Sequence, residues 1–135
     1  MSSKKKSIIN NRSKKIIVVT NCVNFLEERG DDNINSVEIP ETETSINDNA
    51  FSGCNKLKSV SMSDSVISIG NEAFFDCLNL TSINFSNSLK SIGKEAFISC
   101  NGLTTIKIPD TLTKIGEESF FSCINLTNVT LSNKL

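Results

Sequence analysis

Residues 103–123 read LTTIKIPDTLTKIGEESFFSC, and this stretch decides the fold because its pattern recurs at a fixed interval. The interval is 23 residues from Cys54 to Cys77, from Cys77 to Cys100 and from Cys100 to Cys123. The same step joins three further columns: Phe51, Phe74, Phe97 and Phe120; Ile46, Ile69, Ile92 and Ile115; Leu57, Leu80, Leu103 and Leu126. One constant period in independent columns indicates a repeat protein, in which each unit forms one coil of the chain.

A strand is predicted at the start of each unit. Leu103 to Ile108 has the L-x-x-L-x-L type of spacing, and its last four residues alternate polar and apolar side chains as a half-buried strand does. Residues 57–62, 80–85 and 126–131 repeat the pattern. Pro40 and Pro109 stand at strand ends, where a missing ladder donor does least harm.

The rest of the unit predicts a second extended segment and a closing turn. The segment ends in the glycine column Gly70, Gly93 and Gly116, where we expect glycine to relieve steric restriction at a turn. The stretch from there to the cysteine is too short for a stable isolated helix, and it predicts one helical or 3₁₀ turn held by packing.

Stacking is the predicted folding reaction. One coil cannot enclose its own apolar side chains, whereas coils stacked at the strand spacing of about 4.8 Å line up identical side chains into interior ladders. Four full units lie between Val37 and Asn128, followed by a terminal strand. We expect Phe74→Ala or Phe97→Ala to cost about 3–5 kcal/mol, because each ring belongs to a ladder.

The unit resembles the BspA-type, or Treponema pallidum type, leucine-rich repeat, whose pattern is close to L-x-x-I-x-I-P-x-x-V-x-x-I-G-x-x-A-F-x-x-C. Residues 103–123 fill this pattern with Ser119 in place of Ala, and the resemblance covers residues 37–135. It implies a β-rich solenoid and a non-enzymatic scaffold for protein binding, in a family that includes adhesin-like surface antigens. The first unit departs at Glu43 and Asn47, which predicts a distorted first coil. Ser63 and Ser86 replace the usual Pro.

Composition disfavours catalysis and nucleic-acid binding. The chain of 135 residues has no His, Trp or Tyr, which removes imidazole bases, His metal ligands and phenols. The formal net charge is −1, whereas a nucleic-acid binder needs a strongly basic face. No phosphate-binding glycine motif and no C-x-x-C metal motif occurs in the sequence. We therefore expect no catalytic residues, no cofactor and no metal.

The two ends differ from the repeats. Residues 1–15 carry six basic residues and no acid, and we expect a disordered leader there, with an electrostatic contact as the alternative. Residues 16–36 predict a degenerate N-terminal cap or a short amphipathic helix through Cys22, Phe25 and Leu26. Residues 37–135 form the predicted array. Its last strand ends at Leu131, which predicts an open edge suited to self-association.

The cysteines favour packing over chemistry. Four of the five occupy one equivalent place per coil, and Cys is among the most buried residue types. Stacked side chains rarely have the dihedral angle of a disulfide, so we expect free buried thiols. Cys22 stands apart, with a capping core residue favoured over a reactive thiol.

The strand residues between the buried ones form the candidate protein-binding face. These outward residues are small or polar and recur at the repeat interval. The candidate partner-binding residues are Ser59, Ser61, Ser82, Asn84, Thr105, Lys107, Asn128 and Thr130. Phe75 and Phe121 follow ladder phenylalanines, and they predict either an apolar spot on the turn side or packing inside the turn.

Three functions are compatible with this pattern, in order of preference. The first is a non-enzymatic scaffold that binds another protein through its strand face or open edge. The second is a structural fragment of a longer array, or a self-associating module, without separate binding activity. An enzyme using Cys or carboxylates is the least favoured. No apolar run is long enough for a transmembrane helix, and no apolar region follows the basic start as in a signal peptide, so we expect a cytoplasmic protein. Surface association is what the resemblance implies.

Overall fold

The computed structural model describes residues 8–11, 14–17 and 35–131. The first two strands are β1 (Ile8–Asn11) and β2 (Lys14–Ile17). The longer strands of the repeat are β3 (Ser36–Ile39), β5 (Ser59–Met62), β7 (Ser82–Asn84), β9 (Thr105–Ile108) and β11 (Asn128–Leu131). Two-residue strands follow them: β4 (Ser45–Ile46), β6 (Ser68–Ile69), β8 (Ser91–Ile92) and β10 (Lys114–Ile115).

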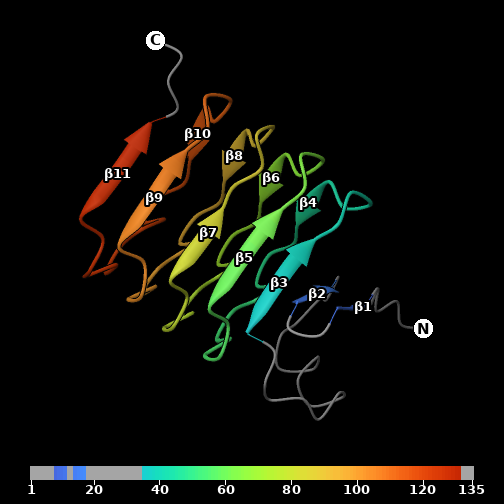
Figure 1. Ribbon diagram of the computed structural model, residues 1–135. Helices are drawn as coiled ribbons and strands as arrows, with labels where there is room; N and C mark the ends of the chain where they lie inside the picture. Colours follow the sequence, from blue (N-terminus) through green and yellow to red (C-terminus); the bar gives the residue numbers. More distant parts are fainter. Residues whose placement is uncertain (1–7, 12–13, 18–34, 132–135) are drawn as a thin grey trace.

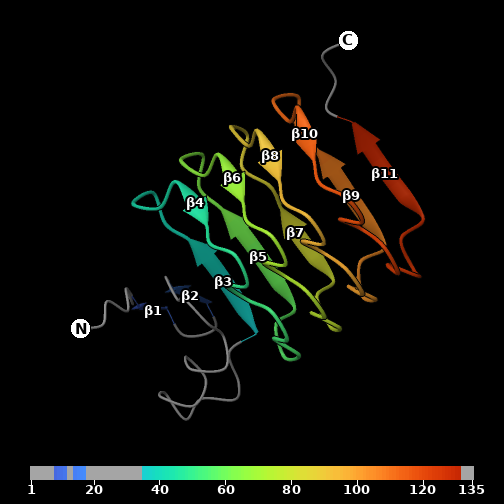
Figure 2. The same ribbon diagram turned by 180° about the vertical axis from the view of Figure 1, so that it is seen from behind.

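The units stack as parallel coils (Figure 1). Each coil contributes one longer strand to one side and one two-residue strand to the other, and the view from behind shows the same two rows (Figure 2). Equivalent residues pair across neighbouring coils: Val37 is in register with Val60, and Ser68 with Ser91. The predicted solenoid, with one strand and a second extended segment per coil, is confirmed.

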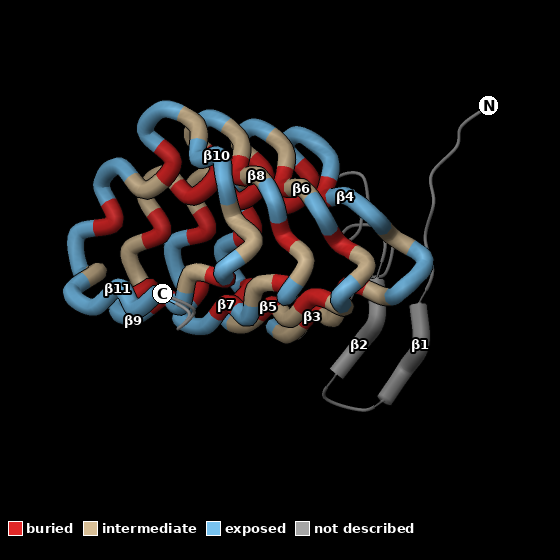
Figure 3. Tube along the Cα trace, turned by 90° about the horizontal axis from the view of Figure 1, so that it is seen from above, coloured by how far each residue is buried: buried red, intermediate tan, exposed pale blue. Residues whose placement is uncertain are grey.

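Buried residues recur at equivalent places in successive coils (Figure 3). The rings of Phe51, Phe74, Phe97 and Phe120 stack in a column, with centroids 5.2, 5.0 and 5.1 Å apart. Phe74 and Phe97 are fully buried. Such a column cannot form within one coil, so burial of each ring depends on the coils above and below it.

The closing turn of each coil is not a helix. The Phe74 amide donates to the Ala96 carbonyl of the next coil at 2.7 Å, whereas the Phe75 amide donates back to the Glu72 carbonyl at 3.2 Å. Glu72 and Asp76 adopt left-handed backbone with φ of 57° and 58°. Because alternate amides bond between coils, the described residues form hydrogen-bonded turns and contain no α- or 3₁₀-helix. The predicted helical turn is therefore replaced by left-handed turns.

The glycine column serves close packing between coils. A Cβ on Gly93 would lie 2.6 Å from the backbone nitrogen of Asn71 in the preceding coil, and Gly70 and Gly116 are equally close to theirs. Among the described glycines, positive φ occurs only at Gly53. The expected role in turn conformation is wrong for this column, because the missing side chain makes room for the neighbouring backbone.

The first coil keeps the repeat geometry despite its sequence departures. The Glu43 amide bonds the Pro40 carbonyl at 3.0 Å, as the Leu112 amide bonds the Pro109 carbonyl at 3.2 Å. β3 and β4 pair in register with β5 and β6. The expected distortion at Glu43 and Asn47 is therefore not observed, because the intercoil ladders fix the backbone.

Two strands precede the repeat. β1 and β2 form an antiparallel pair, and β2 pairs in parallel with β3 through Lys15 and Val37. They occupy part of the stretch for which the sequence predicts a disordered leader and the start of a cap. The division into leader, cap and array stays a prediction. The amphipathic helix through Cys22, Phe25 and Leu26 lies outside the described residues.

Candidate protein-binding face

The strand face is the outward side of β3, β5, β7, β9 and β11. Strands β3 and β5 alternate half-buried and buried residues, because the inward positions hold the ladder and the outward positions face solvent. All eight candidate residues lie on outward positions of β5, β7, β9 and β11. The two on β5, Ser59 and Ser61, are partly exposed. Those on the other three strands are exposed: Ser82, Asn84, Thr105, Lys107, Asn128 and Thr130.

Small polar side chains align along this face. Ser59 pairs with Ser36 and Ser82 in the ladder, and the Ser59 hydroxyl donates to the Ser36 hydroxyl oxygen at 3.0 Å. Asn128 and Thr130 pair with Thr105 and Lys107. The face therefore presents hydroxyl and amide groups at the spacing of the strands.

The strand face is divided between β7 and β9, which the repeat pattern does not predict. β7 is the edge of the sheet β1-β2-β3-β5-β7, whereas β9 pairs with β11 in a separate two-stranded sheet. The row β4-β6-β8-β10 on the other side is continuous. The division is a departure from the repeat on the strand face alone, and the coils remain stacked behind it.

Loop geometry changes at the division. The amides of Thr81 and Ser82 donate to the Lys58 carbonyl, and the same bonds recur one coil beyond the division, from residues 127 and 128 to the Thr104 carbonyl. Among the described residues, no such bonds join residues 104 and 105 to the Thr81 carbonyl. The strand-face ladder is therefore absent at the step from the third coil to the fourth, where β8 and β10 still pair on the other side.

Two departures from the repeat flank the division. Gly102 occupies the column of Asn79 and Asn125, whose side-chain amides donate to the preceding coil at 2.6 and 2.8 Å. Gly102 lacks this bond, and its backbone sits so close that a Cβ would lie 2.7 Å from the Leu80 carbonyl oxygen. Phe85 occupies the column of Met62 and packs edge-on against Phe97, with centroids 5.8 Å apart. A shifted loop and a larger side chain thus meet at the division.

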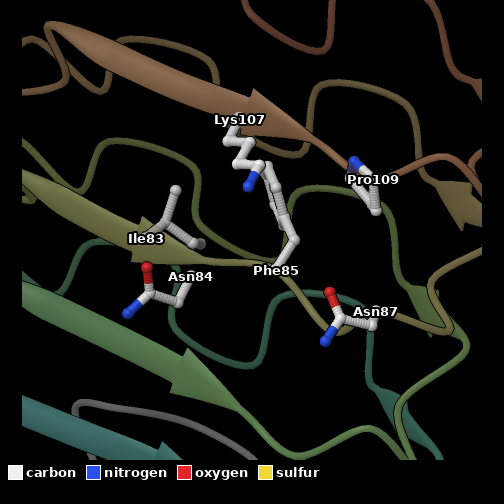
Figure 4. Close-up of a pocket in the computed structure, with 6 residues that line it drawn as sticks. All are labelled: Ile83, Asn84, Phe85, Asn87, Lys107 and Pro109. Carbon is white, nitrogen blue, oxygen red and sulfur yellow. The ribbon is translucent and has the colours of Figure 1, made fainter. Parts of the chain in front are cut away.

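A pocket of about 200 Å³ opens at the division (Figure 4). Its lining, which we call the β7–β9 pocket, is Ile83, Asn84, Phe85, Asn87, Lys107 and Pro109. The alternation of the strands places Asn84 and Lys107 outward without predicting a cavity. The available signal was the break in the columns at Phe85 and Gly102.

Three ladder cysteines carry free thiols: Cys77, Cys100 and Cys123. The Cys77 thiol donates to the Phe51 carbonyl at 3.0 Å, and burial raises its pKa to about 12. Burial raises the pKa of Cys100 further, with the neighbouring Cys77 and Cys123 thiols adding to the effect. Protonated, buried thiols are poor nucleophiles, so these three act as packing residues.

The expectation of free thiols is wrong at Cys54. This residue is disulfide-bonded, and its partner is none of the other ladder cysteines, because those are free. The stacking geometry disfavours a disulfide only between neighbouring ladder cysteines. It places no restriction on a bond to a cysteine outside the ladder. Cys22 lies outside the described residues. No group of three or more His, Cys, Asp or Glu that could hold a metal ion occurs in the described part of the chain.

The fourth coil and the terminal strand expose apolar side chains. Ile115 is 50% exposed, whereas Ile92 in the same column is 1% exposed. Val129 and Leu131 on β11 are more than half exposed. On the turn side, Phe121 is exposed and Phe75 is half-buried. Exposure of Phe121 agrees with the predicted apolar spot, and burial of Phe75 agrees with the alternative of packing inside the turn.

The family is identified by the repeat. The model of the BspA type leucine rich repeat region, in six copies, matches residues 29–135. The chain belongs to this family. Leucine-rich repeat proteins are solenoid scaffolds whose extended surfaces bind other proteins. No curated protein matches the chain. Within the described residues, no helix has the length and apolar character needed to span a membrane.

Solved structures share the fold. A leucine-rich repeat protein from Bacteroides ovatus is 32% identical with a TM-score of 0.70, covering 91% of this chain and 31% of its own. One from Bacteroides capillosus is 26% identical with a TM-score of 0.70, covering 98% of both chains. A leucine rich cell surface protein from Faecalibacterium prausnitzii is 24% identical with a TM-score of 0.67, and the match covers 90% of this chain and 36% of that protein's chain. The chain thus spans about a third of the B. ovatus and F. prausnitzii proteins.

Proposed function

We propose that this chain is a non-enzymatic module that binds a protein partner through its strand face. The observation that carries the proposal is the outward row of β5, β7, β9 and β11, which repeats polar side chains on a stacked backbone. Both the parallel ladders and the ring column hold this backbone in place, so ordering the face on binding costs little conformational entropy.

We further propose a role at a cell surface. The support is the similarity to the F. prausnitzii protein, whose name describes a leucine rich cell surface protein. A strand face of hydroxyl and amide groups suits contact with an extended protein segment, because such groups both donate and accept hydrogen bonds. An adhesin-like contact with a protein of another cell is the form of this role that the family resemblance favours.

The experiment selects ligands from a displayed random-peptide library on the intact chain. A triple variant, Ser59→Arg, Ser82→Arg and Thr105→Arg, places large charges across the strand face. The matched control makes Ser45→Arg, Ser68→Arg and Ser91→Arg on β4, β6 and β8, on the other row. We expect the first variant to lose the selected peptides and the control to keep them. Equal recovery on both variants would remove the strand-face proposal.

Self-association through β11 is a second candidate. Val129 and Leu131 are 53% and 66% exposed, and in the described residues no strand pairs with β11 on its outer side. An open, apolar strand edge favours pairing with a second copy. Analytical ultracentrifugation of the intact chain should show a dimer that Leu131→Lys disrupts. A monomer at the highest accessible concentration would exclude this candidate.

A further inference from the structure

We propose that the β7–β9 pocket binds a glutamate side chain of an extended protein segment lying across the strand face. The inference rests on the proposed function and makes it specific, because it assigns a chemical preference to one place on the face. The carrying observation is the division of the sheet between β7 and β9, which opens a pocket where an unbroken ladder would close it.

The polar part of the pocket suits a carboxylate. Figure 4 shows Lys107 reaching from β9 toward β7, with Asn84 and Asn87 on the β7 side. Within the described residues, no ion pair involves Lys107, and no side-chain hydrogen bond involves the carboxamides of Asn84 and Asn87. The Lys107 ammonium group and the carboxamides of Asn84 and Asn87 therefore line one pocket, and within the described residues no ion pair or side-chain hydrogen bond occupies them. A carboxylate accepts bonds from all three groups.

The apolar part of the pocket suits the methylene groups of glutamate. Phe85, Ile83 and Pro109 line it, and the Phe85 ring is held edge-on against Phe97 at an interplanar angle of 81°. The wall is therefore preorganised, which reduces the entropic cost of binding. A volume of about 200 Å³ lies below the range of about 300–1,000 Å³ of drug-sized ligand sites, and it matches one side chain.

The position of the β7–β9 pocket on the strand face favours, as its occupant, a side chain within an extended segment over the terminus of a chain. The pocket opens between β7 and β9, with the outward rows of β5 and β11 on either side of it. A segment crossing the strands can therefore place one residue in the pocket and continue in both directions over Ser61 and Thr130. A short peptide alone should bind weakly, with Kd on the order of 1 mM, because an exposed ion pair contributes little.

The test is an NMR titration of the intact chain with acetyl-Ala-Ala-Glu-Ala-Ala-amide. We expect saturable shifts at the side-chain amides of Asn84 and Asn87, and binding about three- to fivefold weaker for the peptide with Gln in place of Glu. Lys107→Met should weaken binding of the Glu peptide by about the same factor. Lys114→Met on β10 is the matched control, since it removes an exposed lysine from the other row, and it should bind as the unchanged protein does.

Three outcomes overturn the inference: equal binding of the Glu and Gln peptides, unchanged binding by Lys107→Met, or shifts that map away from the pocket. Tighter binding of acetyl-tetra-alanine with a free carboxyl terminus also overturns it, because the occupant is then a chain terminus. Library peptides that bind Lys107→Met fully yet fail on the strand-face triple variant would remove the pocket and leave the proposed function intact. Failure of the proposed function would instead appear as equal recovery on the triple variant and its control.

Discussion

The two ends of the array carry equivalent apolar columns but differ in burial. Ile46 in the first coil is 4% exposed, whereas Ile115 in the last is 50% exposed. Val37 and Val129, the second residues of β3 and β11, are 4% and 53% exposed. β2 pairs with β3 on its outer side, and among the described strands none does so for β11. The difference teaches that a repeat residue is buried by its neighbouring coil and not by its own.

Truncation of a ladder phenylalanine is the largest expected effect. Phe51→Ala should lower the free energy of unfolding by about 3–5 kcal/mol, because the ring is buried and leaves a cavity. Phe120→Ala should cost about half as much, since Phe120 stacks on Phe97 on one side and is partly exposed. Urea unfolding of both variants measures the difference. Equal costs at the two ends would break the comparison.

Filling the space between coils is the next largest effect. Gly93→Ala should cost about 1–3 kcal/mol, because its Cβ would lie 2.6 Å from backbone atoms of the preceding coil. Gly116→Ala meets an equally close backbone, but among the described strands none pairs with β10 on its outer side, so this segment is expected to move away. We therefore expect the smaller loss at Gly116, measured by the same urea unfolding. A larger loss at Gly116 would contradict this explanation.

The buried thiols make stability depend on pH. The pKa of Cys77 is raised from 9.0 to about 12, so the folded state keeps a proton that the unfolded state loses. Stability is therefore complete below about pH 9 and falls by about 1.4 kcal/mol per pH unit per thiol, until the folded thiol also ionises near pH 12. Cys77→Ala should reduce this slope by one thiol's share in urea unfolding between pH 9 and 11, because Cys100 keeps its own contribution. Cys123→Ala in the last coil should reduce it less, and a slope unchanged by Cys77→Ala would contradict burial of the proton.

The smallest expected effect is a gain in stability from replacing Glu at left-handed backbone positions. This gain should be equal at the two positions compared, because the strain is local to each residue. Glu72 and Glu118 both adopt left-handed backbone, with φ of 57° and 53°. Asn tolerates this conformation better, so Glu72→Asn and Glu118→Asn should each stabilise the protein by about 0.5 kcal/mol. Thermal melts of the two variants provide the measurement. A gain at one site alone would show that neighbouring coils also set the backbone strain.

The repeat columns allow most of the fold to be predicted. The period fixes the strands, the register and the ring column, because equivalent residues must meet when equal coils stack. The helical turn was not predictable in detail, since alternate amides such as that of Phe74 bond the next coil, which a single unit does not reveal. The role of Gly93 was hidden for the same reason, because the atoms it accommodates belong to another unit.

Alternation correctly predicts which strand residues point outward, but it does not predict the division of the strand face. Gly102 and Phe85 each break a column of the repeat, but one break does not show its effect, which arises because both flank the same step between coils. Burial at the two ends was equally hidden, because Ile46 and Ile115 are the same residue in the same pattern. The periodic sequence thus predicts the packing between equal neighbours, and it does not predict how the packing changes where a neighbour differs.

Residue-resolved hydrogen exchange of the intact chain tests most directly whether neighbouring coils supply the stability. The Phe74 amide bonds the next coil at 2.7 Å and lies under coils on both sides, whereas the Asn128 amide bonds only the preceding coil, at 3.1 Å. We predict slow exchange at Phe74 through opening of the whole array, and exchange at Asn128 faster by at least a hundredfold through local opening of the last coil. Equal protection at the two amides would contradict this dependence on neighbouring coils.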